Sequence, residues 1–296
     1  MAEMNVDSLM HLFRRAVFAF SGGASLRSYE SACLNAIRSA LTAPAQEVLS
    51  AQLEAFDLIQ RFFNDKLITF HDLRDRTYKI WPQDQFFASR REEELIAASV
   101  WFRFTSKSKK SGIVRANMVL WGGRLVQMDF DKSPRRAPAG GSPEGDVEIL
   151  RVTVWFDPMS VPFTPGPLEV GTLTGWVGEL AAQGKVITAR SPLPPERRSI
   201  VLKQYESQFP PDYLDVIAQA DGCDLRGCRI FGLSELWRIV LPDETFIVIA
   251  EVTGKADIAV AQSGGRQLYL IDHEEHDVPR PSGEILQDVL RRECPT

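Results

Sequence analysis

The chain has 296 residues, of which 25% are charged and 44% hydrophobic. These proportions are typical of a folded protein and exclude wholesale disorder, and the length favours two domains of about 100–200 residues each. No apolar run reaches the roughly 18 residues of a membrane-spanning helix, so we expect no membrane contact. An acidic start and the Arg14–Arg15 pair argue against a signal peptide. Four cysteines are too few for a disulfide framework in a chain this long, which favours a cytoplasmic protein.

The net charge of −5 is unevenly divided along the chain. Residues 1–160 contain 21 Lys and Arg against 19 Asp and Glu, whereas residues 205–296 contain 8 against 17, a balance of −9. A concentrated negative field disfavours nucleic acid as a partner of this segment and favours basic proteins or cations. The alternative is an acidic surface that only confers solubility.

The first half of the chain predicts helices followed by an antiparallel meander. Apolar periodicity predicts helices at about 7–20, 26–42 and 45–64. Alternation predicts strands at 95–105, 113–121, 124–130 and 147–156. Gly122–Gly123 is a two-residue hairpin signal, and residues 132–146, rich in Pro, Gly and charge, predict a loop. We therefore expect an α+β domain over residues 1–165.

Residues 157–171 contain four prolines and two glycines, which is typical of a connector, and a second domain is expected at 166–296. Apolar patterning predicts a short helix within about 173–186, helices opening at 195 and 211, and a final helix at about 282–292. Strands are expected at 246–251, 258–260 and 268–271.

Several short motifs follow one another between residues 195 and 292. They are Phe209-Pro210-x-Asp212-Tyr213, Asp221-Gly222, Ile230-Phe231-Gly232-Leu233 with Leu236, Ile249-Ala250-Glu251 through Asp257-x-Ile258, and Leu268-Tyr269-x-x-Asp272-His273-Glu274. In this order and spacing they resemble the SUKH superfamily, which includes bacterial immunity proteins and a yeast cell-wall-assembly regulator.

The resemblance implies an antiparallel sheet flanked by helices and a binding role that needs neither catalysis nor a cofactor. Bacterial members of the superfamily commonly sequester a toxin, often a nuclease. Together with the acidic second half, this predicts a protein-binding module that neutralises a basic toxin; a regulatory scaffold of cell-envelope or signalling machinery is the alternative. The expected partner contacts are Asp221, Asp224, Trp237, Asp243, Glu244, Asp257, Asp272, Glu274, Glu275 and Asp277. The alternative for the carboxylates is solvated loop charge, and for Trp237 packing within its own domain.

Metal binding and catalysis have little support in the sequence. Cys223, Cys228, His273 and His276 are suitable zinc ligands by type, but their spacing is unusual and they lie in separate segments, so we expect no metal. His273-Glu274-Glu275-His276 is one residue short of the His-Glu-x-x-His motif. Neither a Gly-x-Ser-x-Gly elbow nor a glycine-rich phosphate loop is present. We therefore do not expect an enzyme.

A basic cluster lies near aromatic residues in the first half. Lys107, Lys109, Lys110 and Arg115 follow or flank Trp101, Phe102 and Phe104. Such a mixture occurs on nucleic-acid surfaces. Aromatic side chains alternating along a strand more often form a core, and lysines in a hairpin protect sheet edges. We expect no nucleic-acid partner.

Overall fold

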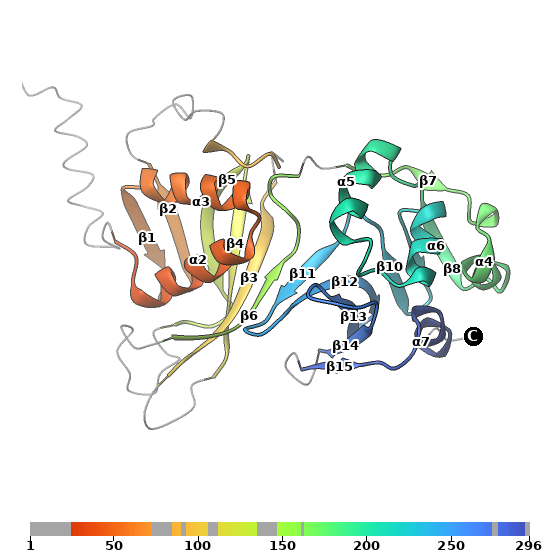
Figure 1. Cartoon of the computed structure of the whole chain (residues 1–296). Helices are drawn as coiled ribbons and strands as arrows, with labels where there is room; N and C mark the ends of the chain where they lie inside the picture. The colour runs from red at the N-terminus through yellow and green to blue at the C-terminus, as the bar shows by residue number, and fades with distance from the viewer. Residues whose placement is uncertain are drawn as a thin grey trace, which may run out of the picture. The chain divides into compact units, whose positions relative to one another are not determined.

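The fold is taken from a computed structural model, which describes residues 25–72, 85–89, 93–105, 112–134, 147–160, 163–273 and 278–293 (Figure 1). The helix expected at 7–20 and most of the loop expected at 132–146 lie outside these residues. The chain divides into two compact units, Met1–Val161 and Pro162–Thr296, a few residues before the expected boundary. Both units combine helices with antiparallel strands, so the fold class is α+β, as expected.

Unit 1 places two helices on one face of an antiparallel sheet (Figure 1). The helices are α2 (Ser28–Ala40) and α3 (Ala43–Ala55). The strands are β1 (Leu58–Phe62), β2 (Leu67–His71), β3 (Leu95–Phe104), β4 (Val114–Trp121), β5 (Arg124–Phe130) and β6 (Val147–Val154), in the order β1-β2-β5-β4-β3-β6. Gly122 and Gly123 have φ of 57° and 81°, which side chains disfavour, and they form the expected tight hairpin between β4 and β5.

The helix expected at 45–64 is wrong beyond Ala55. Ile59, Phe62 and Phe63 fit a helical period, but the chain forms β1 and then reverses through Phe63, Asn64 and Asp65, whose φ values are 54°, 57° and 66°. Leu58 and Ile59 of this strand are buried, and so is Arg61, which pairs with the buried Glu30 of α2 (Nη2–Oε2 2.6 Å). Phe63, by contrast, is 74% exposed. A buried ion pair and strand pairing therefore override the apolar period.

Unit 2 contains the remaining elements. Its helices are the 3-10 turn η2 (Val170–Thr172), α4 (Gly175–Ala182), α5 (Pro195–Tyr205), α6 (Pro211–Gln219) and α7 (Leu286–Glu293). Its strands are β7 (Pro167–Leu168), β8 (Val186–Arg190), β9 (Gly222–Leu225), β10 (Cys228–Phe231), β11 (Trp237–Val240), β12 (Thr245–Val252), β13 (Ala256–Ala261), β14 (Leu268–Asp272) and β15 (Pro279–Pro281).

The long strand β12 organises the sheet of unit 2. β11 pairs with its first half and β10 with its second half, while β13 pairs with both. The sheet continues from β10 through β9 and β8 to β7, and from β13 through β14 to β15. The expected helices and the strands at β12, β13 and β14 are confirmed. The short strands β7 to β11 and β15 were not expected; at β8, Val186 was assigned to the preceding helix.

The start of α6 fastens the helices of unit 2 together. Pro211 opens the helix, where its missing N–H costs no hydrogen bond. The carboxylate of Asp212 accepts hydrogen bonds from the backbone N–H of Tyr213 (3.1 Å) and of Gln287 in α7 (2.8 Å). The indole of Trp176 in α4 donates to the Asp212 carbonyl oxygen (3.1 Å). One short segment thereby joins α4, α6 and α7.

Candidate functional site

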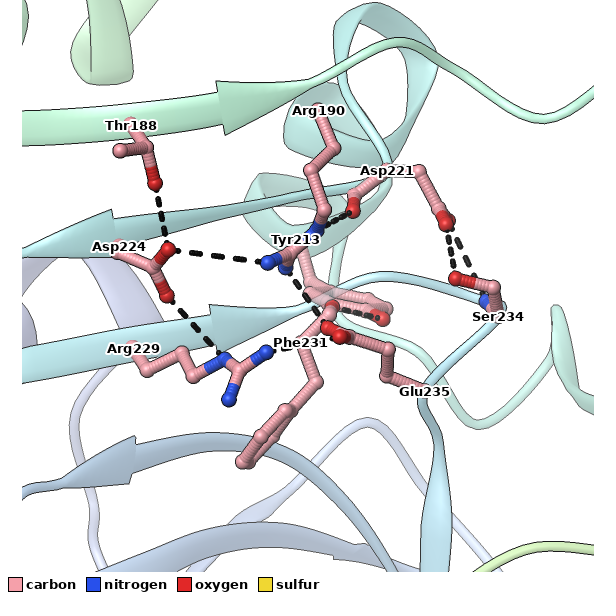
Figure 2. Close-up of polar contacts among 9 residues, drawn as sticks. All are labelled: Thr188, Arg190, Tyr213, Asp221, Asp224, Arg229, Phe231, Ser234 and Glu235. Atoms are coloured by element: carbon pink, nitrogen blue, oxygen red, sulfur yellow. Dashed lines mark hydrogen bonds and ion pairs between the residues drawn. The ribbon is translucent and has the colours of Figure 1, made fainter. Parts of the chain in front are cut away.

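Four charged side chains of unit 2 form a closed ring, which we call the charge ring (Figure 2). Arg190 contacts Glu235 (Nη2–Oε2 2.7 Å) and, at longer range, Asp224 (Nη1–Oδ2 3.8 Å). Arg229 contacts Asp224 (Nε–Oδ1 3.2 Å) and Glu235 (Nη2–Oε1 2.8 Å). Each arginine meets both carboxylates, so the net charge of the ring is zero.

Strand register brings the charge ring together. Asp224 on β9 lies opposite Thr188 on β8 and opposite Arg229 on β10, and Thr188 donates a hydrogen bond to its carboxylate. Arg190 is two residues beyond Thr188 and so projects from the same face. Glu235 comes from the loop before β11. The expected partner contact Asp224 is therefore half-exposed but is already neutralised by two guanidinium groups.

Asp221 lies beside the charge ring but is buried, so the expectation that it reaches a partner is wrong. Its carboxylate accepts hydrogen bonds from the hydroxyl and backbone N–H of Ser234, and Arg190 Nε donates to its carbonyl oxygen (2.9 Å) (Figure 2). A Cβ added at Gly232 would lie 2.3 Å from that carbonyl oxygen. Asp221 thus fastens the loop that delivers Glu235 to the ring.

Tyr213 is a further internal contact. Its hydroxyl donates to the Phe231 carbonyl oxygen (2.8 Å) at the end of β10 (Figure 2). Burial raises the pKa of Tyr213 well above its usual value, so the phenol stays protonated and remains a donor. The polar members of the Phe209–Tyr213 and Asp221–Leu233 motifs therefore serve the fold.

Two other expected contacts are also buried. Oδ1 of Asp257 on β13 lies 3.1 Å from Nε2 of His273, and Asp257 is almost inaccessible to solvent. Trp237 packs edge-on against Phe231 with ring centroids 6.3 Å apart, which is the packing alternative stated for it. As direct contacts to a partner, both expectations are wrong in this structure, because both side chains are buried.

The remaining expected acidic residues do not form one patch. Asp243 is exposed in the turn between β11 and β12, and the neighbouring Glu244 accepts hydrogen bonds from the backbone N–H of Thr245 (2.9 Å) and of Ser263 (3.2 Å). Asp272 is half-buried at the end of β14, opposite Ala256. The two places lie at opposite ends of β13, on the order of 15 Å apart along the strand. Glu274, Glu275 and Asp277 lie outside the described residues.

The cysteines and histidines are not assembled into a metal site within the described ranges. Cys223 and Cys228 are buried thiols on neighbouring strands and form no disulfide, and each lies opposite a different residue, Ile230 and Leu225. Burial raises the pKa of Cys223 to about 12, which disfavours the thiolate that a metal or a substrate would need. No group of three or more His, Cys, Asp or Glu is placed to hold a metal among the described residues; His276 lies outside them.

Sequence reasoning missed Arg190, Arg229 and Glu235. They lie far apart in the sequence, and only the pairing of β8, β9 and β10 brings them together, so no local motif indicates the charge ring.

Comparisons with protein-family models, with curated proteins and with solved structures returned no match. Among the described helices, none has both the length and the hydropathy to cross a membrane.

Proposed function

We propose that the chain is a non-enzymatic protein-binding module of the cytoplasm that neutralises a basic, nuclease-type toxin through acidic loops of unit 2. The proposal rests on how unit 2 uses its polar motif residues. Asp212, Tyr213 and Asp221 are each consumed by hydrogen bonds that hold elements together. These hydrogen bonds give the motif residues a structural role, and a rigid frame that carries exposed loops suits recognition.

The acidic balance of residues 205–296 supports the choice of partner. A charge of −9 on this segment accelerates association with a basic protein, and added salt should reduce this acceleration because it screens the charges. Since the charge ring is neutral, the direct contacts with the partner are assigned to two separate groups of acidic residues. One is Asp243 with Glu244, and the other is Asp272 with the acidic residues that follow it in the sequence, Glu274, Glu275 and Asp277.

Co-expression with the products of the flanking genes tests the proposal. We expect one neighbour to be toxic alone, to be rescued by this chain, and to co-elute with it in gel filtration. The triple variant Glu274→Lys, Glu275→Lys and Asp277→Lys should weaken the complex at least about tenfold, because it reverses charge at one acidic place. The control reverses the same charge at three exposed positions elsewhere in unit 2, Glu169, Glu196 and Glu206.

The two variants separate contact from net charge. Equal loss of affinity in both would mean that only overall charge matters, and the acidic loops would not be the binding face. Absence of both rescue and complex with every neighbour would contradict immunity and favour the scaffold alternative.

A further inference from the structure

The turn between β1 and β2 carries the most exposed large apolar side chain among the described residues. Phe63 is 74% exposed, and the neighbouring Phe62 is 39% exposed. Their rings are neighbours, with centroids 6.4 Å apart. A single exposed apolar residue is ordinary on a protein surface, whereas adjacent ones form a patch that a partner can cover. The two rings therefore form a small accessible patch at one end of the unit 1 sheet.

The backbone of this turn has an unusual conformation. Phe63, Asn64 and Asp65 have φ of 54°, 57° and 66°, in the left-handed region that residues other than glycine rarely adopt. Strained positions of this kind persist only where the surrounding structure holds them, and they are common at binding sites. The contacts that hold this turn are therefore informative.

Three side chains from other parts of unit 1 hold the turn. The buried carboxylate of Asp65 accepts hydrogen bonds from the guanidinium of Arg27 and from the hydroxyl of Tyr29 (3.3 Å), both at the start of α2. Ser133, which follows β5, donates from Oγ to the carbonyl oxygen of Asn64 (2.6 Å). The exposed rings are thus carried by a fixed backbone, and a preorganised anchor loses little conformational entropy on binding.

Cationic side chains lie at the same end of the sheet. Antiparallel pairing of β5 with both β2 and β4 brings together the start of β2, the end of β5 and the start of β4. The backbone N–H of Lys66 donates to the Phe63 carbonyl oxygen (3.4 Å), and the Lys66 carbonyl oxygen accepts from the last residue of β5 (2.8 Å). The exposed cations at these three strand ends are Lys66, Arg115 and Lys132.

The charge of this surface is positive. Lys66, Arg115 and Lys132 form no ion pair within the described ranges. One exposed carboxylate, Asp131, lies among them and accepts a hydrogen bond from the backbone N–H of Arg115 (2.9 Å). Three cations and one carboxylate give a net charge of +2. We call the two rings and the three cations the basic tip: Phe62, Phe63, Lys66, Arg115 and Lys132.

Charge and shape distinguish the possible occupants of the basic tip. A second copy docked tip to tip would bring like charges together. Proteins that bind single-stranded nucleic acid combine an extended positive groove with stacked aromatic rings, whereas here only three cations surround the carboxylate of Asp131. A flexible acidic protein segment satisfies both features, because its carboxylates can reach separated cations while its apolar side chains cover the two rings.

We propose that the basic tip binds a flexible acidic protein segment in which large apolar side chains alternate with carboxylates. Lys66, Arg115 and Lys132 make charge-assisted hydrogen bonds with the carboxylates. Phe62 and Phe63 are the apolar anchor, since burial of aromatic side chains supplies much of the binding energy at protein interfaces. The basic tip belongs to unit 1 and the acidic loops of the proposed toxin contact to unit 2, so the two proposals are independent.

Binding of fluorescein-labelled 15-residue peptides to the full-length chain, measured by fluorescence anisotropy, tests the proposal. The first peptide alternates glutamate and aspartate with leucine and phenylalanine. The second replaces its apolar residues by serine, and the third replaces its acidic residues by lysine. We expect the first to bind at least about tenfold more tightly than either of the others. Phe63→Ser, and separately Lys66→Glu with Lys132→Glu, should each weaken its binding at least about tenfold.

Matched controls change the same kinds of side chain in unit 2. Ile200→Ser removes a side chain that is 68% exposed, and Lys203→Glu with Arg266→Glu reverses two exposed charges. Both should change binding by less than about twofold, because neither alters the basic tip and net charge alone acts mainly at long range. Phe63→Leu keeps an apolar side chain and should retain more binding than Phe63→Ser. Circular dichroism confirms the folding of each variant.

Four results would overturn the proposal. They are no binding of the first peptide up to 1 mM, equal binding of the serine-substituted peptide, equal losses in the tip variants and their controls, and tighter binding of a single-stranded RNA 12-mer that depends on Phe63. The last result would assign the basic tip to nucleic acid. Toxin rescue is measured separately, so failure here leaves the proposed function untouched.

Discussion

Replacing Glu235 by Gln should open the charge ring while preserving side-chain shape. Arg190 and Arg229 would each lose one of two carboxylate partners, leaving Asp224 to serve both. Breaking a fully buried pair costs about 3–5 kcal/mol, and an exposed pair about 0–1 kcal/mol. Glu235 is 31% exposed and Arg190 17%, so solvent screening places the expected loss between these limits. We expect the free energy of unfolding of unit 2 to fall by about 1.5–2 kcal/mol.

Hydrogen exchange of the full-length chain measures this loss of stability specifically in unit 2, because exchange rates are read from peptides that cover β9 and β10. A loss of about 1.5 kcal/mol corresponds to exchange roughly tenfold faster or more. Glu284→Gln is the matched control: it removes the same kind of carboxylate from an ion pair with Arg292, at an exposed site. We expect this control to change stability by less than about 0.5 kcal/mol.

A double-mutant cycle decides whether the ring acts as a unit. The cycle compares the single variants Glu235→Gln and Arg229→Gln with the double variant. The losses of unfolding free energy in the two single variants should add up to about 1 kcal/mol more than the loss in the double variant, because the two residues contact each other and share partners. Additive losses, or equal effects of Glu235→Gln and Glu284→Gln, would refute the reasoning that the ring stabilises unit 2.

Three further predictions concern buried polar groups. Tyr213→Phe leaves the Phe231 carbonyl oxygen without its donor and should cost about 1–2 kcal/mol, seen as a lower urea midpoint of unit 2. Glu30→Gln removes the carboxylate that pairs with the buried Arg61 and should cost about 3–5 kcal/mol, measured as loss of exchange protection in α2 and β1. Asp129 has a raised pKa, so the folded state binds its proton more tightly than the unfolded state. Stability should therefore fall as pH rises from 3.8 through that raised pKa, and the difference between wild type and Asp129→Asn in pH-dependent melting should grow across this window; a constant difference would contradict the assignment.

Local patterns predicted most elements, because alternation and glycine turns are short-range signals. The hairpin at Gly122–Gly123 follows from backbone conformations that only glycine adopts readily. The error at 58–64 has the opposite origin. Leu58–Phe62 is a strand because it pairs with Leu67–His71 and because Arg61 meets Glu30, thirty-one residues earlier. A periodicity argument contains neither fact.

The candidate site shows the same division between local and distant information. The sequence predicted an acidic segment, and its charge is a property of composition alone. It could not predict which carboxylates remain accessible, since Asp221 and Asp257 are indistinguishable by type from Asp243. Their fate depends on Ser234 and His273, partners that only the fold supplies.

Burial of part of the acidic set separates two contributions to recognition. Long-range steering depends on net charge, so pairing within the charge ring leaves the total of residues 205–296 unchanged. The energy of direct contacts depends on charged groups that are not already paired within the protein. In the charge ring, each charge is already paired with opposite charges. Charge reversal at an acidic loop should therefore slow association and also shorten the lifetime of a complex. The same reversal at distant exposed positions should change mainly the association rate and its salt dependence. Dissociation rates therefore identify the binding face of unit 2, because they depend on direct contacts, whereas association rates depend mainly on net charge.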